Sequence, residues 1–189
     1  MNRFFTRVLR KSGLPLWYTE GFNPHLYLTF ALPLSLGFES DYEVVDFRLT
    51  DDSLDLTEVA DKLSPVLPED IKILKVCEPV MKPGKISAAG FDLAFENKTE
   101  ATEFFEFLKE GNIVVSKKTK KGSIKEINVS EKIISYSLSE NIVSLILPAG
   151  NDNINPALVV DSYNMSRDNC IHVSFTRNAL YTDDARLFI

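Results

Sequence analysis

The sequence predicts an α+β protein made of two units in tandem, and three observations lead to this prediction. The chain has 189 residues, 44% of them hydrophobic, which is enough for one large core or two small ones. Helical and strand-like apolar spacings alternate along it. A stretch rich in proline and glycine, EPVMKPGK at residues 78–85, separates two halves in which the order of elements loosely repeats. We therefore expect a first unit at residues 1–80 and a second at residues 86–189.

The first element is a helix from Asn2 to about Ser12. Its apolar residues recur at i, i+1, i+4 and i+5, which places them on one side. Gly13 supplies a C-cap, and Pro15 lies just beyond it. The basic residues fall within an arc of about 100° beside the apolar stripe; they are Arg3, Arg7, Arg10 and Lys11. This helix is predicted to bury one flank and to expose a basic flank.

Strands are expected next at residues 26–34 and 43–49, followed by a helix at 55–67 and a strand at 71–76. Helix, strand, strand, helix, strand is the order of a βαββαβ, ferredoxin-like unit that lacks its opening strand. In such a sheet the first strand is central, and a vacant place would leave ladder groups unpaired. Either the true start lies upstream of Met1, or another segment or a second chain fills the place. The last case predicts a homodimer formed through strands.

The second half is expected to be another α+β sandwich with an elaborated sheet. Thr99 is expected to be the N-cap of its first helix, and Glu140-Asn141 the turn of a hairpin. The expected strands lie at residues 88–95, 113–117, 124–129, 133–138, 142–147 and 170–176, and the expected helices at 99–109 and 156–163. The predicted fold class is therefore α+β, with two ferredoxin-like sandwiches in tandem, the first without its opening strand.

Composition narrows the function classes. No window approaches about 18 consecutive apolar residues and no signal-peptide pattern follows the N-terminal charges, so we expect a cytoplasmic protein without a membrane span. Cys77 and Cys170 lack a partner at CxxC or CxxxC spacing, so we expect both to be buried apolar side chains, with no metal cluster and no disulfide. No Walker loop, GxSxG, HExxH or dinucleotide fingerprint is present. The sequence therefore predicts no metal and no cofactor.

The net charge of −6 is unevenly spread. Residues 1–40 carry four bases and two acids, and residues 111–132 carry six bases and two acids. Such segregation can create a basic face on an acidic protein, and the local potential governs how a polyanion approaches. The lysine-rich segment at residues 116–129 is either a solvated turn that protects a sheet edge or a clamp for phosphates. Its lysines are Lys117, Lys118, Lys120, Lys121 and Lys125.

A turn-forming block, Gly21-Phe22-Asn23-Pro24-His25, precedes a long apolar run. The residue before a proline is pushed out of the α region, and glycine supplies a permissive backbone, so a turn is expected here. His25 should then lie at the top of a strand beside the basic helix. Three roles are open for it: capping a carbonyl, contacting a phosphate or a base, and general acid or base catalysis.

Several of these patterns occur together in one known family. The residues that carry the resemblance are Arg3, Arg10, Lys11, Ser12, Gly13, Leu14 and Pro15, the block Gly21 to His25, the spaced set Pro33, Leu34, Gly37, Ser40, Glu43 and Asp46, Lys125 and Ile127 of the lysine-rich segment, and the closing TRNALY, Thr176 to Tyr181. Through them the chain resembles the bacterial radical SAM-linked protein family, a domain of unknown function.

The resemblance implies a partner and a biological setting. Members are typically fused to, or encoded beside, a radical SAM protein, often near ribosomal and ribonuclease G genes, which suggests RNA metabolism. This chain has no CxxxCxxC, so it would act as a partner or substrate-presenting domain and would not hold the iron–sulfur cluster. The family usually begins with a strand before the first helix, and Met1 falls where that strand should end.

These observations lead to one main hypothesis. The chain is expected to be a non-enzymatic module that binds structured RNA, such as transfer or ribosomal RNA, or recognises a substrate for a radical SAM partner. Asn23 and His25 would position or read a base, and the basic side chains would contact phosphates. The full predicted nucleic-acid-binding set is Arg3, Arg7, Arg10, Lys11, Asn23, His25, Lys117, Lys118, Lys120, Lys121 and Arg177.

Two alternatives stay open. A protein-interaction domain would dock on the radical SAM protein without contacting RNA. A large exposed apolar patch would favour this alternative, whereas a wet and charged first helix would favour RNA. A metal-independent ribonuclease would use His25 as its general acid or base and would cleave RNA in EDTA.

Overall fold

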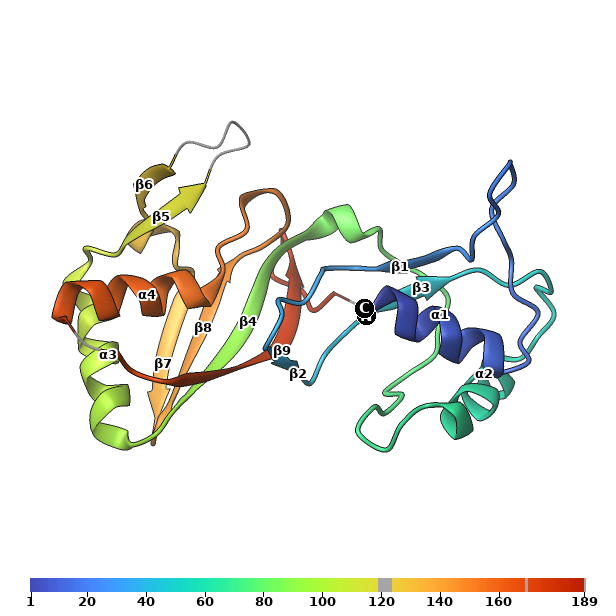
Figure 1. Cartoon of the computed structure of the whole chain (residues 1–189), viewed down its shortest axis with the longest axis horizontal. Coiled ribbons are helices and arrows are strands. Elements are labelled where there is room, and N and C mark those ends of the chain that lie inside the picture. Colours follow the sequence, from blue (N-terminus) through green and yellow to red (C-terminus); the bar gives the residue numbers. More distant parts are fainter. Residues whose placement is uncertain (119–123, 169, 189) are drawn as a thin grey trace. The chain divides into compact units, whose positions relative to one another are not determined.

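The computed structural model describes residues 1–118, 124–168 and 170–188. Helices and sheets are mixed along the chain, which confirms the predicted α+β class (Figure 1). Two compact units form: unit 1 contains Met1–Ala31 and Val44–Lys82, and unit 2 contains Leu32–Glu43 and Pro83–Phe188. This division differs from the predicted one in the segment 32–43, which belongs with unit 2.

Unit 1 packs two helices on a small antiparallel sheet. Its elements are α1 (Asn2–Lys11), β1 (Leu28–Phe30), β3 (Val45–Phe47), α2 (Leu56–Leu63) and the 3₁₀ turn η1 (Ser64–Val66). Strands β1 and β3 pair with Leu28 opposite Phe47. Single bridges, Leu16 to Leu49 and Tyr18 to Leu26, attach the segment that follows α1 to both strands. The strands are shorter than expected because pairing involves only three residues of each.

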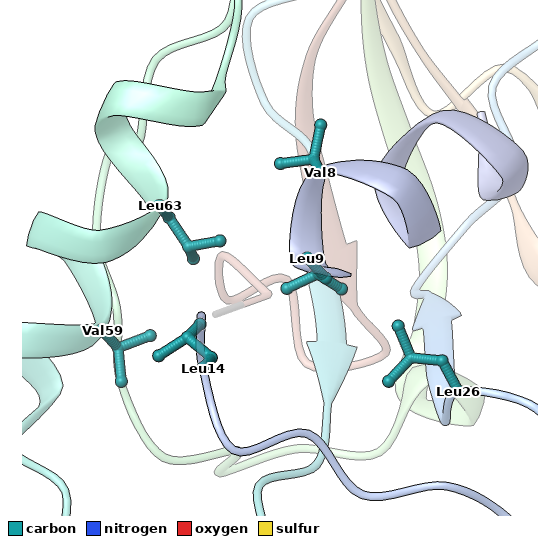
Figure 2. Close-up of a cluster of buried hydrophobic side chains, with 6 residues drawn as sticks. All are labelled: Val8, Leu9, Leu14, Leu26, Val59 and Leu63. Atoms are coloured by element: carbon teal, nitrogen blue, oxygen red, sulfur yellow. The ribbon is translucent and has the colours of Figure 1, made fainter. Parts of the chain in front are cut away.

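The core of unit 1 is a cluster of six buried side chains that point toward one another from α1, α2 and the segments beside β1 (Figure 2). These side chains are Val8, Leu9, Leu14, Leu26, Val59 and Leu63. Burial of an apolar side chain contributes roughly 1.5–3 kcal/mol, so this cluster supplies most of what fixes α1 to the sheet. Of the apolar stripe predicted on α1, Val8 and Leu9 are buried and Phe5 is half-buried, whereas Phe4 is 40% exposed.

The tandem ferredoxin-like arrangement is not confirmed, because unit 1 has only a two-stranded sheet. The strand expected at residues 71–76 is absent from the described structure, where this stretch is irregular. Its apolar spacing has another cause: Ile73 and Val76 are partly buried against the core cluster without pairing to a strand. The apolar spacing at residues 71–76 therefore reflects one partly buried side of an irregular segment and not a strand.

Unit 2 is built on a five-stranded sheet in the order β2-β9-β4-β8-β7. Its elements are β2 (Glu39–Ser40), η2 (Pro83–Lys85), β4 (Ile86–Phe95), α3 (Lys98–Glu110), β5 (Val114–Lys118), β6 (Ile124–Asn128), η3 (Ser130–Lys132), β7 (Ser135–Ser139), β8 (Ile142–Pro148), η4 (Gly150–Asp152), α4 (Pro156–Arg167) and β9 (Val173–Thr182). Strands β5 and β6 form a separate hairpin. Without β2 and this hairpin, the order is β4, α3, β7, β8, α4, β9, which is the βαββαβ order of a ferredoxin-like motif.

Strand β2 is a feature that the sequence did not predict. Residues 35–42 were expected only to connect two strands. Instead, they contain β2, which runs parallel to β9 and adds an edge strand to the sheet (Figure 1). Glu39 lies opposite Thr176, and Ser40 lies opposite Arg177. A two-residue strand has little stability of its own, so side-chain contacts must hold this segment in place.

Three smaller predictions are wrong. The N-cap of α3 is Asn97, whose side chain accepts a hydrogen bond from the Glu100 amide at 3.0 Å, whereas Thr99 lies inside the helix. The closing strand covers residues 173–182 and not 170–176, because it pairs along the whole of β4. Cys77 and Cys170 are both exposed, since neither lies on an apolar face of a helix or strand.

Candidate nucleic-acid interface

The basic flank of α1 is exposed as predicted. Val8 and Leu9 are buried against the rest of unit 1, and Phe5 is half-buried. The side chains of the opposite flank all lie in solvent; they are Arg3, Arg7, Arg10 and Lys11. Because i, i+4 and i, i+3 positions are neighbours on a helix, these four cations form one row along its surface.

Within the described residues, this row of cations is not neutralised by a carboxylate partner. Among residues 1–118, 124–168 and 170–188, none of the four α1 cations takes part in a salt bridge. Like charges at i, i+4, such as Arg3 with Arg7, disfavour a helix by roughly 0.2–0.5 kcal/mol. The first turn of α1 holds no acidic residue, so Arg3 also faces the positive end of the helix dipole. Arg3 and Arg7 therefore cost some stability, whereas Arg10 and Lys11 lie in the last turn, where cations interact favourably with the helix dipole.

The loop before β1 is held in shape by the pair Thr19 and His25. The Thr19 amide donates to the His25 carbonyl at 2.8 Å, and the His25 amide donates to the Thr19 hydroxyl at 3.1 Å. The His25 Nδ1 atom lies 3.0 Å from the same hydroxyl and 3.3 Å from the Asn23 carbonyl oxygen. With Nδ1 engaged in this way, the ring is oriented and its Nε2 atom is the one left to meet a ligand.

Aromatic and guanidinium groups alternate beside this loop, and sequence reasoning missed them. The Arg10 guanidinium lies 5.8 Å from the centre of the Tyr18 ring, which connects α1 to the start of the loop. The Arg48 guanidinium lies 4.9 Å from the centre of the Trp17 ring, and Trp17 meets Tyr27 edge to face. Such cation–π contacts order both partners without neutralising the cation. The signal in the sequence was the three aromatic residues, Trp17, Tyr18 and Tyr27, that surround the turn block in LWYTEGFNPHLY.

Comparison with known proteins identifies the family of this chain. Residues 1–156 match a family described as "Uncharacterized protein conserved in bacteria (DUF2344)". The chain belongs to this family. No curated protein and no solved structure matches it. The matched part contains α1, the turn block and the spaced residues from Pro33 to Asp46.

In this DUF2344 protein the lysine-rich segment belongs to unit 2, whereas α1 belongs to unit 1. Lys117 and Lys118 lie on β5, opposite Lys125 and Ile124 of β6. Lys120 and Lys121 lie outside the residues that the structure describes. The hairpin predicted around this segment is present, but its lysines are not brought together with α1 within either unit.

Arg177 has a structural role that the sequence did not indicate. Only 2% of its surface is exposed, and Nη2 donates to both Glu43 carboxylate oxygens at 2.5 and 2.6 Å. Nε donates to Oε1 at 2.9 Å, and the carbonyls of Leu32 and Pro33 accept the remaining bonds at 2.8 and 3.1 Å. Each of the three guanidinium nitrogens is hydrogen-bonded inside the protein, and a guanidinium buried in this way cannot reach a phosphate. We therefore leave Arg177 out of the interface.

Three of the spaced residues of this DUF2344 sequence, Pro33, Ser40 and Glu43, take part in the same contact network. The Ser40 hydroxyl lies 2.6 Å from Glu43 Oε1 and 3.1 Å from the Arg177 carbonyl oxygen. Ser40 and Glu43 thus hold the segment 32–43 against β9. One contact network accounts for the spacing of Ser40 and Glu43 and for the arginine in TRNALY, Arg177. Asp46 lies outside this network, on β3, and partial burial raises the pKa of its carboxyl.

The described parts of this DUF2344 chain contain neither a metal-ligand cluster nor a membrane-spanning helix. No group of three or more histidine, cysteine, aspartate or glutamate residues there is arranged to hold a metal ion. None of the helices described is both long enough and apolar enough to cross a bilayer. An open hollow of about 590 Å³ lies between α3 and α4, beside Glu103, Tyr163 and Arg167. Its mixed charges give it no clear ligand.

Proposed function

We propose that this protein is a non-enzymatic module that binds structured RNA, or recognises an RNA substrate, in partnership with a radical SAM protein. One observation carries the RNA part of the proposal: α1 presents four exposed cations in a row without a carboxylate partner among the described residues. Cations of this kind gain most from phosphates, because each contact releases a condensed counterion. The radical SAM partner rests on the family resemblance alone.

The structure of the loop extends this surface. Arg10 links the row to Tyr18, and Tyr18 lies next to the Thr19–His25 pair. Asn23 and an oriented His25 are then placed to position or read a base, while α1 holds the backbone. Phosphate contacts fix register and base contacts give selectivity, so the two parts have different experimental signatures.

The direct test is RNA binding across a salt titration with the triple variant Arg3→Gln, Arg7→Gln, Arg10→Gln. Each lost phosphate contact should reduce the slope of log affinity against log salt by about 1, so the triple variant should lose about 2–3. A matched control removes the same charge elsewhere in unit 1 through Lys72→Gln, Lys75→Gln and Lys82→Gln, which are all exposed.

The control should leave the slope nearly unchanged. Equal slopes for both triple variants would show that α1 is not the phosphate-contacting element. Thermal unfolding should show little net change for the α1 variant, because Arg3→Gln and Arg7→Gln relieve repulsion while Arg10→Gln removes one exposed cation–π contact. A pull-down with the purified radical SAM protein tests the partner separately.

A second candidate, association through a protein strand, is favoured by the edge of the unit 2 sheet. β7 is an edge strand, its sequence SYSLS carries no charge, and Tyr136 and the preceding Ile134 are exposed. Charged residues normally protect such an edge, so β7 can accept a strand from a second copy or from a protein partner. Sedimentation should reveal dimers that Ser137→Lys abolishes; a monomer at all concentrations would exclude the homodimer.

The ribonuclease alternative keeps His25 as its single candidate group. The ring is hydrogen-bonded to Thr19 and to the Asn23 carbonyl, and neither group titrates near neutral pH. This alternative predicts RNA cleavage in EDTA that His25→Ala removes, so intact RNA after incubation with the wild-type protein would exclude it.

A further inference from the structure

Phe22 stands out as the most exposed aromatic side chain of unit 1. It lies at the tip of the loop between Thr19 and His25, its exposed fraction is 102%, and the loop projects beyond the strands of unit 1 (Figure 1). A single exposed apolar residue is ordinary on a protein surface. The setting of this one is different, because its backbone is fixed and its neighbours are aromatic and basic.

The loop is preorganised by three features. The Thr19 amide and the His25 amide bond across its base at 2.8 and 3.1 Å. Gly21 has φ +118°, a backbone conformation that side chains rarely adopt, and no heavy atom lies within 4 Å of the place a Cβ would take. Glycine is therefore required by the backbone turn and not by a close contact. Because the backbone that carries Phe22 is held at the base of the loop, the loop itself loses little conformational entropy when it meets a ligand.

The surroundings of the loop indicate what the ligand is. Tyr18 and Tyr27 enter and leave it with 37% and 45% of their surfaces exposed, and the Arg10 guanidinium lies over Tyr18. Exposed rings next to unpaired cations match the two faces of a single-stranded nucleotide, a flat base and an anionic phosphate. Paired bases in an A-form helix are stacked on one another and offer no free face to such a ring.

We propose that Phe22 stacks on an unpaired base, so that the ligand class is RNA with single-stranded nucleotides in a loop or bulge. This inference rests on the proposed RNA-binding function and adds a residue and a substrate class to it. The row on α1 holds the phosphates, His25 and Asn23 contact the edge of the base, and Phe22 covers its face. Uninterrupted duplex RNA reaches only the phosphate contacts.

The test compares two synthetic RNAs with the same number of nucleotides, a stem–loop and a blunt duplex, by fluorescence anisotropy with the full chain. The wild-type protein should prefer the stem–loop. Phe22→Ala should weaken stem–loop binding about 5- to 150-fold and leave duplex binding unchanged. Its salt slope should stay at the wild-type value because no charge is removed. Phe22→Trp should restore binding.

Controls separate stacking from other effects. Leu36 is equally exposed, at 103%, but lies in unit 2, so Leu36→Ala should have no effect on either RNA. A 2-aminopurine in the loop should change its emission on binding wild-type protein and not on binding Phe22→Ala. Equal melting temperatures of the wild-type and Phe22→Ala proteins would show that the fold is intact.

The outcomes distinguish this inference from the proposed function. Equal affinity for the two RNAs, or equal weakening of both by Phe22→Ala, overturns the stacking role while salt-dependent binding through α1 still stands. Absence of binding to either RNA at low salt overturns both and leaves the protein-docking alternative. A stem–loop preference that depends on Phe22, with the 2-aminopurine signal, supports both.

Discussion

Glu43 accepts hydrogen bonds from Arg177 and Ser40 inside unit 2, and its carboxylate is the only counter-charge that the described residues give to this guanidinium. Removing one member of a buried ion pair leaves the other charge without compensation. The contact also holds β2, so its loss affects the sheet edge as well as the pair.

Glu43→Ala should therefore lower the free energy of unfolding by about 3–5 kcal/mol. Urea denaturation followed by circular dichroism measures it. Glu106→Ala is the matched control: it breaks the exposed pair of Glu106 with Lys109, and its cost should stay below about 1 kcal/mol. Similar losses for the two variants would contradict the structural role of Glu43.

Asp46 gives a pH-dependent prediction. Burial raises the pKa of its carboxyl in the folded state above the ordinary value of 3.8. The folded protein therefore holds this proton more tightly than the unfolded chain, and stability falls as pH rises through the interval from 3.8 to the raised pKa. Asp46→Asn removes this loss of stability because asparagine does not ionise. The variant should therefore melt at a higher temperature than the wild-type protein at pH 7, and the difference should disappear below pH 3.8. A pH-independent difference would show another cause.

Single residues also mark the limit of what the sequence could predict. The exposed bases on α1 and the turn at Asn23-Pro24 follow from local spacing, and the structure has both. Arg177 did not follow, because arginine is almost never fully buried unless paired and its partner lies 134 positions earlier. A contact at that separation leaves no local pattern.

At the scale of elements, α3 shows which signal places a helix start. Asn97 has an extended backbone and its side chain accepts from the Glu100 amide, so it satisfies one of the unpaired amides of the first turn. Thr99 was the predicted cap because it precedes the apolar spacing. The true cap, Asn97, lies two residues earlier, and the helix begins at Lys98. Helix ends are set by such single bonds and not by periodicity.

Asn97→Ala should then destabilise the protein by about 1 kcal/mol, and Thr99→Ala should change it by less than about 0.5 kcal/mol. Both side chains are exposed, which makes the pair well matched. Equilibrium denaturation of the two variants tests the assignment. A larger loss from Thr99→Ala would restore the predicted cap.

Strands were predicted less well than helices for a related reason. An amphipathic helix such as α1 closes its own hydrogen bonds, whereas a strand exists only if a neighbour pairs with it. Residues 71–76 have apolar spacing and no neighbour, and β2 has a neighbour and almost no spacing signal. In unit 2, by contrast, the predicted strands β4, β7, β8 and β9 each pair with a neighbour in the same sheet.

At the scale of the whole molecule, stability should be distributed unevenly along the first half of the chain. The Asp41 amide donates to the Arg177 carbonyl at 2.9 Å, next to the β2 pairing. In contrast, residues 71–80 form no helix or strand, and the amide of Ile71 bonds only locally, to the Pro68 carbonyl. Amides opened by local fluctuation exchange quickly, whereas those that need sheet opening exchange slowly.

Hydrogen–deuterium exchange should accordingly show slow exchange at residues 39–41 and fast exchange at residues 71–80, although both were predicted to be parts of one unit. Mass spectrometry of peptic peptides measures this. In Glu43→Ala the protection at residues 39–41 should be lost first. Equal exchange rates of the two segments in the wild-type protein would contradict the assignment of residues 32–43 to unit 2.

The Glu43–Arg177 contact also sets the order of events during synthesis. A ribosome that has made Glu43 must add 134 further residues before Arg177 appears. At roughly 5–20 residues per second this takes about 7–27 s. During that interval the rest of unit 1, through Lys82, is made and can pack against α1, whereas residues 32–43 have no sheet to join. The nascent chain therefore exposes its basic helix before unit 2 closes, so any ligand of α1 can bind while translation is still in progress.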